Sequence, residues 1–289
     1  MKLDLNAFAK EKNILLGVTN AEPLECDVPE VPFVTFSKNE RTDPKVFFPY
    51  AKSIIVMAVP YAWMVDAYPK DMRRRGVFSV SVAQPDYHSV IRKFLNELDQ
   101  YISEKHSFVR DSYVDTGPLL ERALAVRAGL GFIGLNQSLI TKEFGSFVNL
   151  GYMVTDLELE PFSGEVRNSC EMCGRGLRSC PTGSITKNCY NYRKCISWLT
   201  QSPKLDEEQS ASLNFHLYGC DECQFACPHN KKSIGVLKSE DVYPKIETIL
   251  SLTGSGFTSR FKDTCIYWRG SRILKRNAEI ALKNEKSDT

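Results

Sequence analysis

Two short cysteine runs constrain this 289-residue chain more than any other feature of its sequence. The runs are Cys170-x2-Cys173-x6-Cys180-Pro181 and Cys220-x2-Cys223-x3-Cys227-Pro228, with Cys195 between them. Both end in Cys-Pro, as do the runs of bacterial ferredoxins, in which short loops let several thiolates converge on one iron-sulfur cluster. The sequence therefore predicts iron-sulfur chemistry.

The N-terminal residues indicate the compartment in which these thiols work. Asp4, Lys10 and Glu11 interrupt the apolar stretch that an export signal needs. The longest apolar run, residues 54–59, is too short to span a membrane. Because cytoplasmic thiols are kept reduced, ten cysteines in such a chain indicate metal binding rather than disulfides. We expect a cytoplasmic protein with no membrane segment.

The ferredoxin pattern divides the cysteines into two ligand sets. In the run C-x2-C-x2-C-x3-C-P, three cysteines hold one cluster and the fourth reaches the other. Applied here, the pattern gives one complete set, formed by Cys180, Cys195, Cys220 and Cys223. The other set has only Cys170, Cys173 and Cys227. Gly176 stands where its remaining cysteine is expected.

Gly176 leaves several alternatives open. Water or another ligand holds one iron, or the cluster has three irons, or Cys189 fills the gap, or the first cluster is absent or labile. Zinc is a further alternative, since zinc also binds paired C-x2-C units. The Cys-Pro endings favour iron-sulfur clusters over zinc. We assign no role to Cys26 and Cys265.

Hydrophobic periodicity predicts an α+β protein. It indicates an amphipathic helix over residues 2–16, a buried strand over 54–59 and a helix over 86–104. A strand over 108–114 precedes a helix that begins at Pro118 and ends at Gly129, and residues 147–154 are rich in β-formers. The composition changes near residue 160. The expected domains are therefore 1–160, a cysteine-rich domain at 161–234, and a helical segment at 235–289.

Several motifs resemble the epoxyqueuosine reductase family. They are VDTGPLLERALAVRAGLGFIGLN (114–136), GSFVNLG (145–151), CPTGSI (180–185), KCISWLT (194–200) and YGCDECQFACPHN (218–230), with DYH at 86–88 and RNAEIAL at 276–282. The likeness covers nearly the whole chain. It implies an oxidoreductase with two [4Fe-4S] clusters and cobalamin, which reduces epoxyqueuosine in the tRNA wobble position to queuosine.

The resemblance also implies an architecture and a set of site residues. The expected order is a cobalamin-binding α/β domain like that of reductive dehalogenases, a ferredoxin-like double-cluster domain and a short helical tail. Asp115 is implied as the proton donor to the epoxide oxygen, and burial beside its apolar neighbours would keep its carboxyl protonated. The cobalamin contacts implied are Tyr87, Asp115, Asn136, Ser146 and Asp221.

Two departures from the family pattern bear on the expected partners. Leu135 stands where the family usually has lysine, and the family's C-terminal repeats run on for several helices where this chain stops at Thr289. Those repeats present basic surface to tRNA, whereas a net charge of +2 on this chain allows only local phosphate contacts. We expect a monomer that acts on tRNA and receives electrons from an external low-potential donor.

Other functions fit parts of the same pattern. One is a cytosolic enzyme like the reductive dehalogenases, which would share cobalamin and two clusters. Another is a ferredoxin-like electron carrier without cobalamin, which would need no proton donor. Asp115 itself has a structural alternative, in which it caps the helix that begins at Pro118 or pairs with Arg122.

Overall fold

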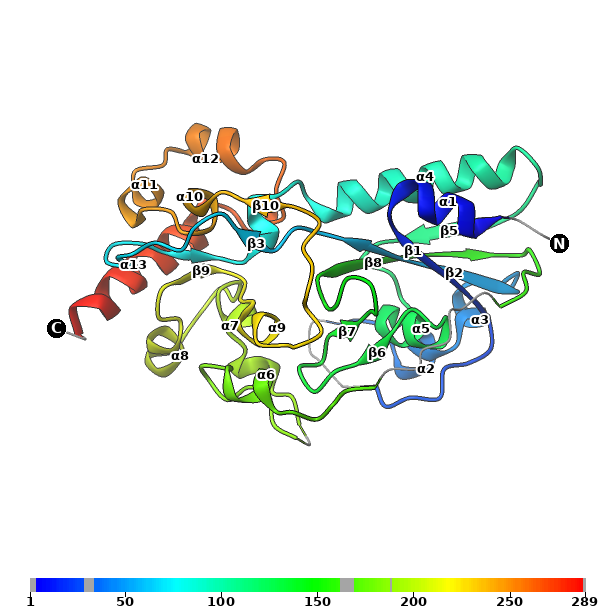
Figure 1. Cartoon of the computed structure of the whole chain (residues 1–289), viewed down its shortest axis with the longest axis horizontal. Coiled ribbons are helices and arrows are strands. Elements are labelled where there is room, and N and C mark those ends of the chain that lie inside the picture. Colours follow the sequence, from blue (N-terminus) through cyan, green and yellow to red (C-terminus); the bar gives the residue numbers. More distant parts are fainter. Residues whose placement is uncertain (1–3, 29–33, 162–168, 188, 288–289) are drawn as a thin grey trace. The chain divides into compact units, whose positions relative to one another are not determined.

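The computed structural model describes residues 4–28, 34–161, 169–187 and 189–287, which form two compact units (Figure 1). Unit 1 comprises residues 1–60, 88–134 and 138–171, and unit 2 comprises residues 61–87, 135–137 and 172–289. Each unit is therefore assembled from separated stretches of chain. The domain boundaries expected near residues 160 and 234 stay a prediction. Residues 61–87 and 235–289 belong to unit 2.

A four-stranded antiparallel sheet forms the centre of unit 1. Its strands, in spatial order, are β1 (Leu15–Asn20), β2 (Ser53–Pro60), β8 (Val148–Thr155) and β5 (Arg110–Tyr113). Every residue of β2 is buried, because this inner strand is covered on both faces. The strand predicted over residues 54–59 is confirmed.

Helices cover both faces of this sheet (Figure 1). On one face α4 (Tyr87–Ser103) packs Ile91 so close to Gly151 of β8 that a Cβ at Gly151 would lie 2.5 Å from it. On the other face Leu124 of α5 (Glu121–Arg127) joins Ile54 and Val56 in one buried cluster. The helix predicted over residues 86–104 is confirmed. The remaining elements of unit 1 are α1 (Leu5–Lys12), α2 (Lys38–Thr42), α3 (Pro44–Phe47), β6 (Phe132–Ile133) and β7 (Leu139–Ile140).

The first helix is shorter than predicted. It ends at Lys12 because Asn13 takes the left-handed backbone conformation, with φ of 53°. The apolar residues that follow suit a helix face or a strand equally well. Here they enter the sheet, where Leu15 pairs with Ala58 of β2. The prediction of a helix over residues 2–16 is therefore wrong beyond Lys12, and residues 2 and 3 lie outside the described residues.

Unit 2 joins distant stretches of sequence through two parallel strand pairs. β3 (Met64–Val65) pairs with β10 (Val236–Leu237), and β4 (Val77–Phe78) pairs with β9 (His216–Tyr218). The helices of unit 2 are η1 (Val80–Ala83), α6 (Arg175–Arg178), η2 (Tyr192–Lys194), α7 (Ile196–Leu199), α8 (Glu207–Ser212), α9 (Glu222–Phe225), α10 (Ser239–Val242), α11 (Ile246–Leu250), α12 (Gly254–Phe261), η3 (Tyr267–Arg269) and α13 (Ser271–Ser287).

The C-terminal helices belong to the core of unit 2. Phe261 of α12 lies in the same buried cluster as Phe78 of β4. Asn277 of α13 is fully buried, and its Nδ2 donates hydrogen bonds of 2.8 Å to the carbonyl oxygens of Thr200 and Leu217. Satisfied polar groups of this kind are costly to disrupt. The helical pattern predicted over residues 235–289 is found from Ser239 to Ser287, whereas Val236–Leu237 form strand β10.

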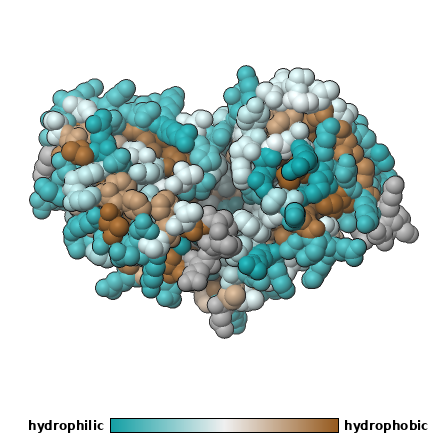
Figure 2. Space-filling model, turned by 180° about the vertical axis from the view of Figure 1, so that it is seen from behind, coloured by the Kyte–Doolittle hydropathy of each residue, from teal (hydrophilic) through white to brown (hydrophobic). Residues whose placement is uncertain are grey.

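The surface is mixed in polarity. Figure 2 shows hydrophobic colour on one face in patches separated by hydrophilic surface. Large apolar side chains that remain exposed include Tyr68, Val236 and Trp268. Across the described residues, every helix is too short or too polar to cross a bilayer.

Candidate active site

Four predicted cluster ligands lie at helix ends within unit 2. Cys180 follows α6, Cys195 precedes α7, and Cys220 and Cys223 flank the start of α9. Burial, followed by charges on Cys195, Asp221 and Cys180, raises the pKa of Cys223 to about 12. Burial also raises the pKa of Cys220, and charges on Asp221, Cys223 and Cys195 add to this rise. Cys195 therefore lies near both Cys220 and Cys223, and Cys180 lies near Cys223.

These four cysteines are the predicted ligands of one iron-sulfur cluster. In a [4Fe-4S] cubane each cysteine sulfur binds a different iron, so the four sulfurs surround an object larger than one ion. Among the described residues, no three His, Cys, Asp or Glu side chains converge tightly enough to hold a single metal ion. The assignment of the complete set of four cysteines to a cubane stays a prediction.

Gly176, the position at which the incomplete ligand set lacks a cysteine, lies in α6. A Cβ at Gly176 would lie 3.1 Å from the carbonyl oxygen of Cys223 and 3.4 Å from the Cβ of Asn136. The position that lacks a cysteine therefore packs against a residue of the complete set. Cys170 belongs to unit 1, whereas Cys173 and Cys227 belong to unit 2. Their assembly around one cluster stays a prediction.

Asp115 lies just beyond β5, in a stretch that we call the Asp115 loop (residues 114–120). Its φ of 62° is unusual for a residue with a side chain. Its side chain is 57% exposed, and its Oδ2 lies 3.5 Å from Nε2 of His88 in α4. The prediction that Asp115 is buried beside its apolar neighbours is therefore wrong.

The helix after the Asp115 loop begins later than predicted. We expected it to start at Pro118, but α5 starts at Glu121, with Leu120 as an N-cap that makes no side-chain cap bond. Asp115 therefore does not cap this helix, and that alternative is wrong. Gly129, with φ of 75°, follows the helix and confirms the predicted stop.

Several contacts anchor the Asp115 loop within unit 1. The backbone N–H of Asp115 donates to Oε1 of Glu121 at 2.8 Å, and that of Leu119 donates to the hydroxyl oxygen of Tyr152 at 3.3 Å. Gly117 lies so close that a Cβ there would be 2.1 Å from the same hydroxyl oxygen. The loop backbone is thus anchored while the carboxylate of Asp115 projects outward.

Glu121 is partly buried, and the sequence analysis missed it. Desolvation raises its pKa to about 8, and the charge of Asp115 adds to this, against the effects of the Asp115 N–H and Arg122. Since this folded pKa exceeds the reference of 4.5, the associated stability is present below pH 4.5 and is lost as pH rises to about 8. The only feature of the sequence that pointed to Glu121 was its place in the first turn of a helix. An acidic side chain there usually interacts with the helix dipole.

The five predicted cobalamin contacts are divided between the two units. Asp115 and Ser146 belong to unit 1, and Tyr87, Asn136 and Asp221 belong to unit 2. Ser146 and Asp221 are buried, with exposed fractions of 4% and 6%. The other three are partly buried or exposed, which suits side chains that contact a bound molecule. The cobalamin-binding role of all five stays a prediction.

Asp221 also has a structural task in unit 2. Its Oδ2 accepts a hydrogen bond of 2.8 Å from the backbone N–H of Val80, and its Oδ1 accepts one of 3.0 Å from Nε2 of Gln224. These bonds tie η1 to α9, the helix that begins between Cys220 and Cys223. Asp221 therefore links residues 61–87 to the cysteine-rich part of the chain.

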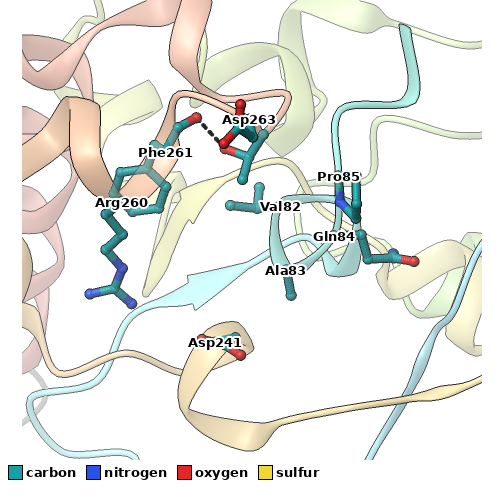
Figure 3. Close-up of a pocket in the computed structure, with 9 residues that line it drawn as sticks. Val82, Ala83, Gln84, Pro85, Asp241, Arg260, Phe261 and Asp263 are labelled. Carbon is teal, nitrogen blue, oxygen red and sulfur yellow. Dashed lines mark hydrogen bonds between the residues drawn. The ribbon is translucent and has the colours of Figure 1, made fainter. Parts of the chain in front are cut away.

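A separate pocket of about 290 Å³ opens in unit 2 (Figure 3). Its lining residues are Val82, Ala83, Gln84, Pro85, Asp241, Arg260, Phe261, Asp263 and Thr264. The hydroxyl of Thr264 donates a hydrogen bond of 2.9 Å to the carbonyl oxygen of Phe261 at its rim. None of the predicted site residues lines this pocket, so it lies apart from the candidate site.

Two family models match the chain. The model described as "Epoxyqueuosine reductase QueG, DUF1730" matches residues 41–116, which end just after Asp115. The model described as "4Fe-4S double cluster binding domain" matches residues 169–230. The second range contains all seven cysteines predicted as cluster ligands.

Similarity to characterised proteins extends over the full chain. The sequence is 36% identical to the epoxyqueuosine reductase of Listeria monocytogenes over 312 residues, which cover 100% of this chain and 82% of the relative. The solved epoxyqueuosine reductase from Streptococcus thermophilus is similar with a TM-score of 0.89 and 34% identity, covering 99% of this chain and 81% of that one. An epoxyqueuosine reductase solved with an epoxyqueuosine-modified tRNA-Tyr stem loop gives a TM-score of 0.88 and 32% identity, covering 98% and 81%.

Proposed function

This chain belongs to the epoxyqueuosine reductase family, and from that premise we propose that it reduces epoxyqueuosine in tRNA to queuosine. Full-length similarity to these enzymes is the observation that carries the proposal. The reaction removes the epoxide oxygen and leaves an alkene. It consumes two electrons and two protons, and the oxygen leaves as water. The protein is thus an oxidoreductase that acts in queuosine modification of tRNA.

The family uses [4Fe-4S] clusters and cobalamin as cofactors. When bound, these groups would supply the two electrons that the reduction consumes. We assign the complete cluster to Cys180, Cys195, Cys220 and Cys223, and the other cluster to Cys170, Cys173 and Cys227. The match of a 4Fe-4S double-cluster model to residues 169–230, which contain all seven cysteines, supports this assignment. We assign cobalamin binding to the N-terminal α/β part, with contacts from Tyr87, Asp115, Asn136, Ser146 and Asp221.

We assign to Asp115 the transfer of one proton to the epoxide oxygen. Breaking the carbon-oxygen bonds places negative charge on that oxygen, and a nearby carboxylic acid neutralises it. The exposure of Asp115 on unit 1 supports this role, because its carboxyl is accessible to a substrate. His88, at 3.5 Å, stabilises the carboxylate that remains after the transfer when its own ring is protonated.

The proposal also covers partners and compartment. The substrate is tRNA, and the electrons come from an external low-potential donor. We propose that the enzyme acts as a monomer in the cytoplasm, where its thiols stay reduced.

Transfer RNA that carries epoxyqueuosine provides the direct test of function. It is prepared from a strain that lacks its own reductase, and then incubated anaerobically with the cluster-loaded protein, cobalamin and a low-potential reductant. Digestion and mass spectrometry should show epoxyqueuosine replaced by a nucleoside that lacks one oxygen. Unchanged epoxyqueuosine in the presence of both cofactors would contradict the proposal.

Gly176→Cys should complete the deficient cluster. We expect iron to rise toward about eight atoms per chain, since the variant restores the ferredoxin spacing. The new Cβ lies 3.1 Å from the carbonyl oxygen of Cys223, so the neighbouring helix α9 must shift slightly. Iron and acid-labile sulfide analysis of anaerobically prepared protein measures the change.

Leu177→Cys is the matched control, because it adds a thiol one position away from the ferredoxin spacing. Its iron content should equal that of the unaltered protein. An unchanged count in Gly176→Cys would mean that another ligand already fills the gap. Adding Cys189→Ser would then show whether Cys189 is that ligand.

A further inference from the structure

The direction of the Asp115 carboxylate depends on an uncommon backbone conformation. At φ of 62°, a residue with a Cβ is strained, and such conformations persist only when their surroundings impose them. Relaxation to a negative φ would turn the side chain elsewhere. Something in unit 1 must therefore hold this backbone in place.

Two hydrogen bonds act at the strained residue. The N–H of Thr116 donates to the carbonyl oxygen of Val114 at 2.7 Å, which closes a tight turn around Asp115, and the N–H of Asp115 itself donates to Glu121. Oε1 of Glu121 accepts the Asp115 N–H at 2.8 Å, so a side chain at the start of α5 reaches back across the loop to the end of β5. This bond joins the two ends of the Asp115 loop. The contact from Leu119 to Tyr152 fixes the far half of the loop, whereas the Asp115 carboxylate lies 3.5 Å from Nε2 of His88.

We propose that Glu121 is a positioning residue, whose carboxyl clasps the Asp115 loop through the Asp115 N–H and thereby directs the Asp115 carboxyl toward substrate. This inference rests on the proposed function, in which Asp115 delivers a proton. Glu121 would transfer no proton itself. It would act only through the backbone of Asp115.

The surroundings of Glu121 suit this structural task. The charged and titratable groups that act on it are Asp115, Arg122 and Tyr152. A carboxyl accepts a hydrogen bond through an oxygen whether or not it is ionised, and the ionised form accepts more strongly. The clasp therefore holds on both sides of neutral pH. A glutamine at this position retains an acceptor oxygen on the same side-chain length.

Two substitutions separate the clasp from a catalytic acid. Glu121→Ala should lower kcat about 10- to 100-fold through misplacement of Asp115, with little change in the KM for tRNA. Its Asp115 loop should exchange backbone amides about 3- to 10-fold faster, as expected when one hydrogen bond is lost. Glu121→Gln should keep kcat and the amide exchange rate of the loop within about threefold of the unaltered enzyme. The matched control is Glu143→Ala, an exposed glutamate in unit 1, which should change neither.

The measurements are steady-state turnover of the loaded enzyme on an epoxyqueuosine tRNA stem loop and hydrogen exchange of peptides that span residues 114–120. Normal kcat in Glu121→Ala, or unchanged exchange of the loop, would overturn the clasp. A Glu121→Gln enzyme as damaged as Glu121→Ala would also overturn it, because the acid rather than the acceptor would then matter. If Glu121→Ala does not fold, the kcat and loop exchange of Glu121→Gln alone decide whether the acceptor oxygen or the acid matters.

A double substitution keeps this inference distinct from the role of Asp115. In an Asp115→Asn background, Glu121→Ala should cause no further loss of kcat, because both changes act on the same group. A further loss would overturn the clasp. If Asp115→Asn alone retained full turnover, the proton-donor role would fail, and loop exchange would still test the clasp by itself.

Discussion

Asp115→Asn should reduce turnover by about 100- to 10,000-fold, the range that a positioned acid contributes. Asparagine has nearly the same shape, and it tolerates the left-handed backbone that Asp115 adopts. Its amide cannot deliver a proton to an oxygen that leaves as water. We therefore expect the visible spectra of clusters and cobalamin to stay unchanged while conversion of epoxyqueuosine stops, as measured by mass spectrometry of digested tRNA.

The exposed Asp111 in β5 provides a comparison for this variant. Its Oδ2 accepts a hydrogen bond from the Tyr50 hydroxyl, and nothing connects it with the proposed chemistry. Asp111→Asn should turn over normally. If Asp115→Asn instead loses its cofactor spectra, the residue is structural and the assignment of the proton donor is wrong.

Cys195→Ser should remove the complete cluster and abolish turnover. A serine hydroxyl is a much poorer ligand for cluster iron than a thiolate, so we expect a loss of about four irons per chain. Cys195 is the informative choice because it lies outside both cysteine runs. Iron analysis and the visible absorption of anaerobically purified protein measure the effect.

Cys26→Ser is the control for this experiment. Cys26 is partly buried in unit 1 and belongs to neither ligand set. Iron content and turnover should stay unchanged in that variant. If Cys195→Ser retains all its iron, Cys195 is not a ligand, and the division of the seven cysteines into two sets must be redrawn.

Elements defined by local pattern were predictable from the sequence. The uninterrupted apolar run of β2 has only one stable environment, a strand covered on both faces. The long amphipathic pattern of α4 likewise leaves few alternatives, and its buried residues repeat with helical spacing. The predicted start of α5 was wrong, because contacts of Glu121 and Tyr152 hold the preceding residues as a loop. Those contacts depend on tertiary structure.

The site was predictable where the chemistry requires particular residue types. Cysteine spacing predicts the cluster ligands, and the family motif predicts the role of Asp115; both stay predictions. The exposure of Asp115 was not predictable, because its apolar neighbours in sequence point into the core while its own side chain turns outward. Glu121 escaped notice for a similar reason. An acid in a first helical turn gives no sign that it bonds backwards to a strained residue.

The parallel strand pairs of unit 2 have a consequence for synthesis of the protein. The sheet of unit 1 is complete once a ribosome has made Thr155, yet β3 and β4 were made long before their partners. β4 can pair only after β9, near residue 216, has been synthesised, and β3 only after β10, near residue 236. On the proposed ligand assignment, iron can enter the complete set of thiolates only after Cys223 has been synthesised. That cluster would therefore be completed only after all strands of the unit 1 sheet have been made.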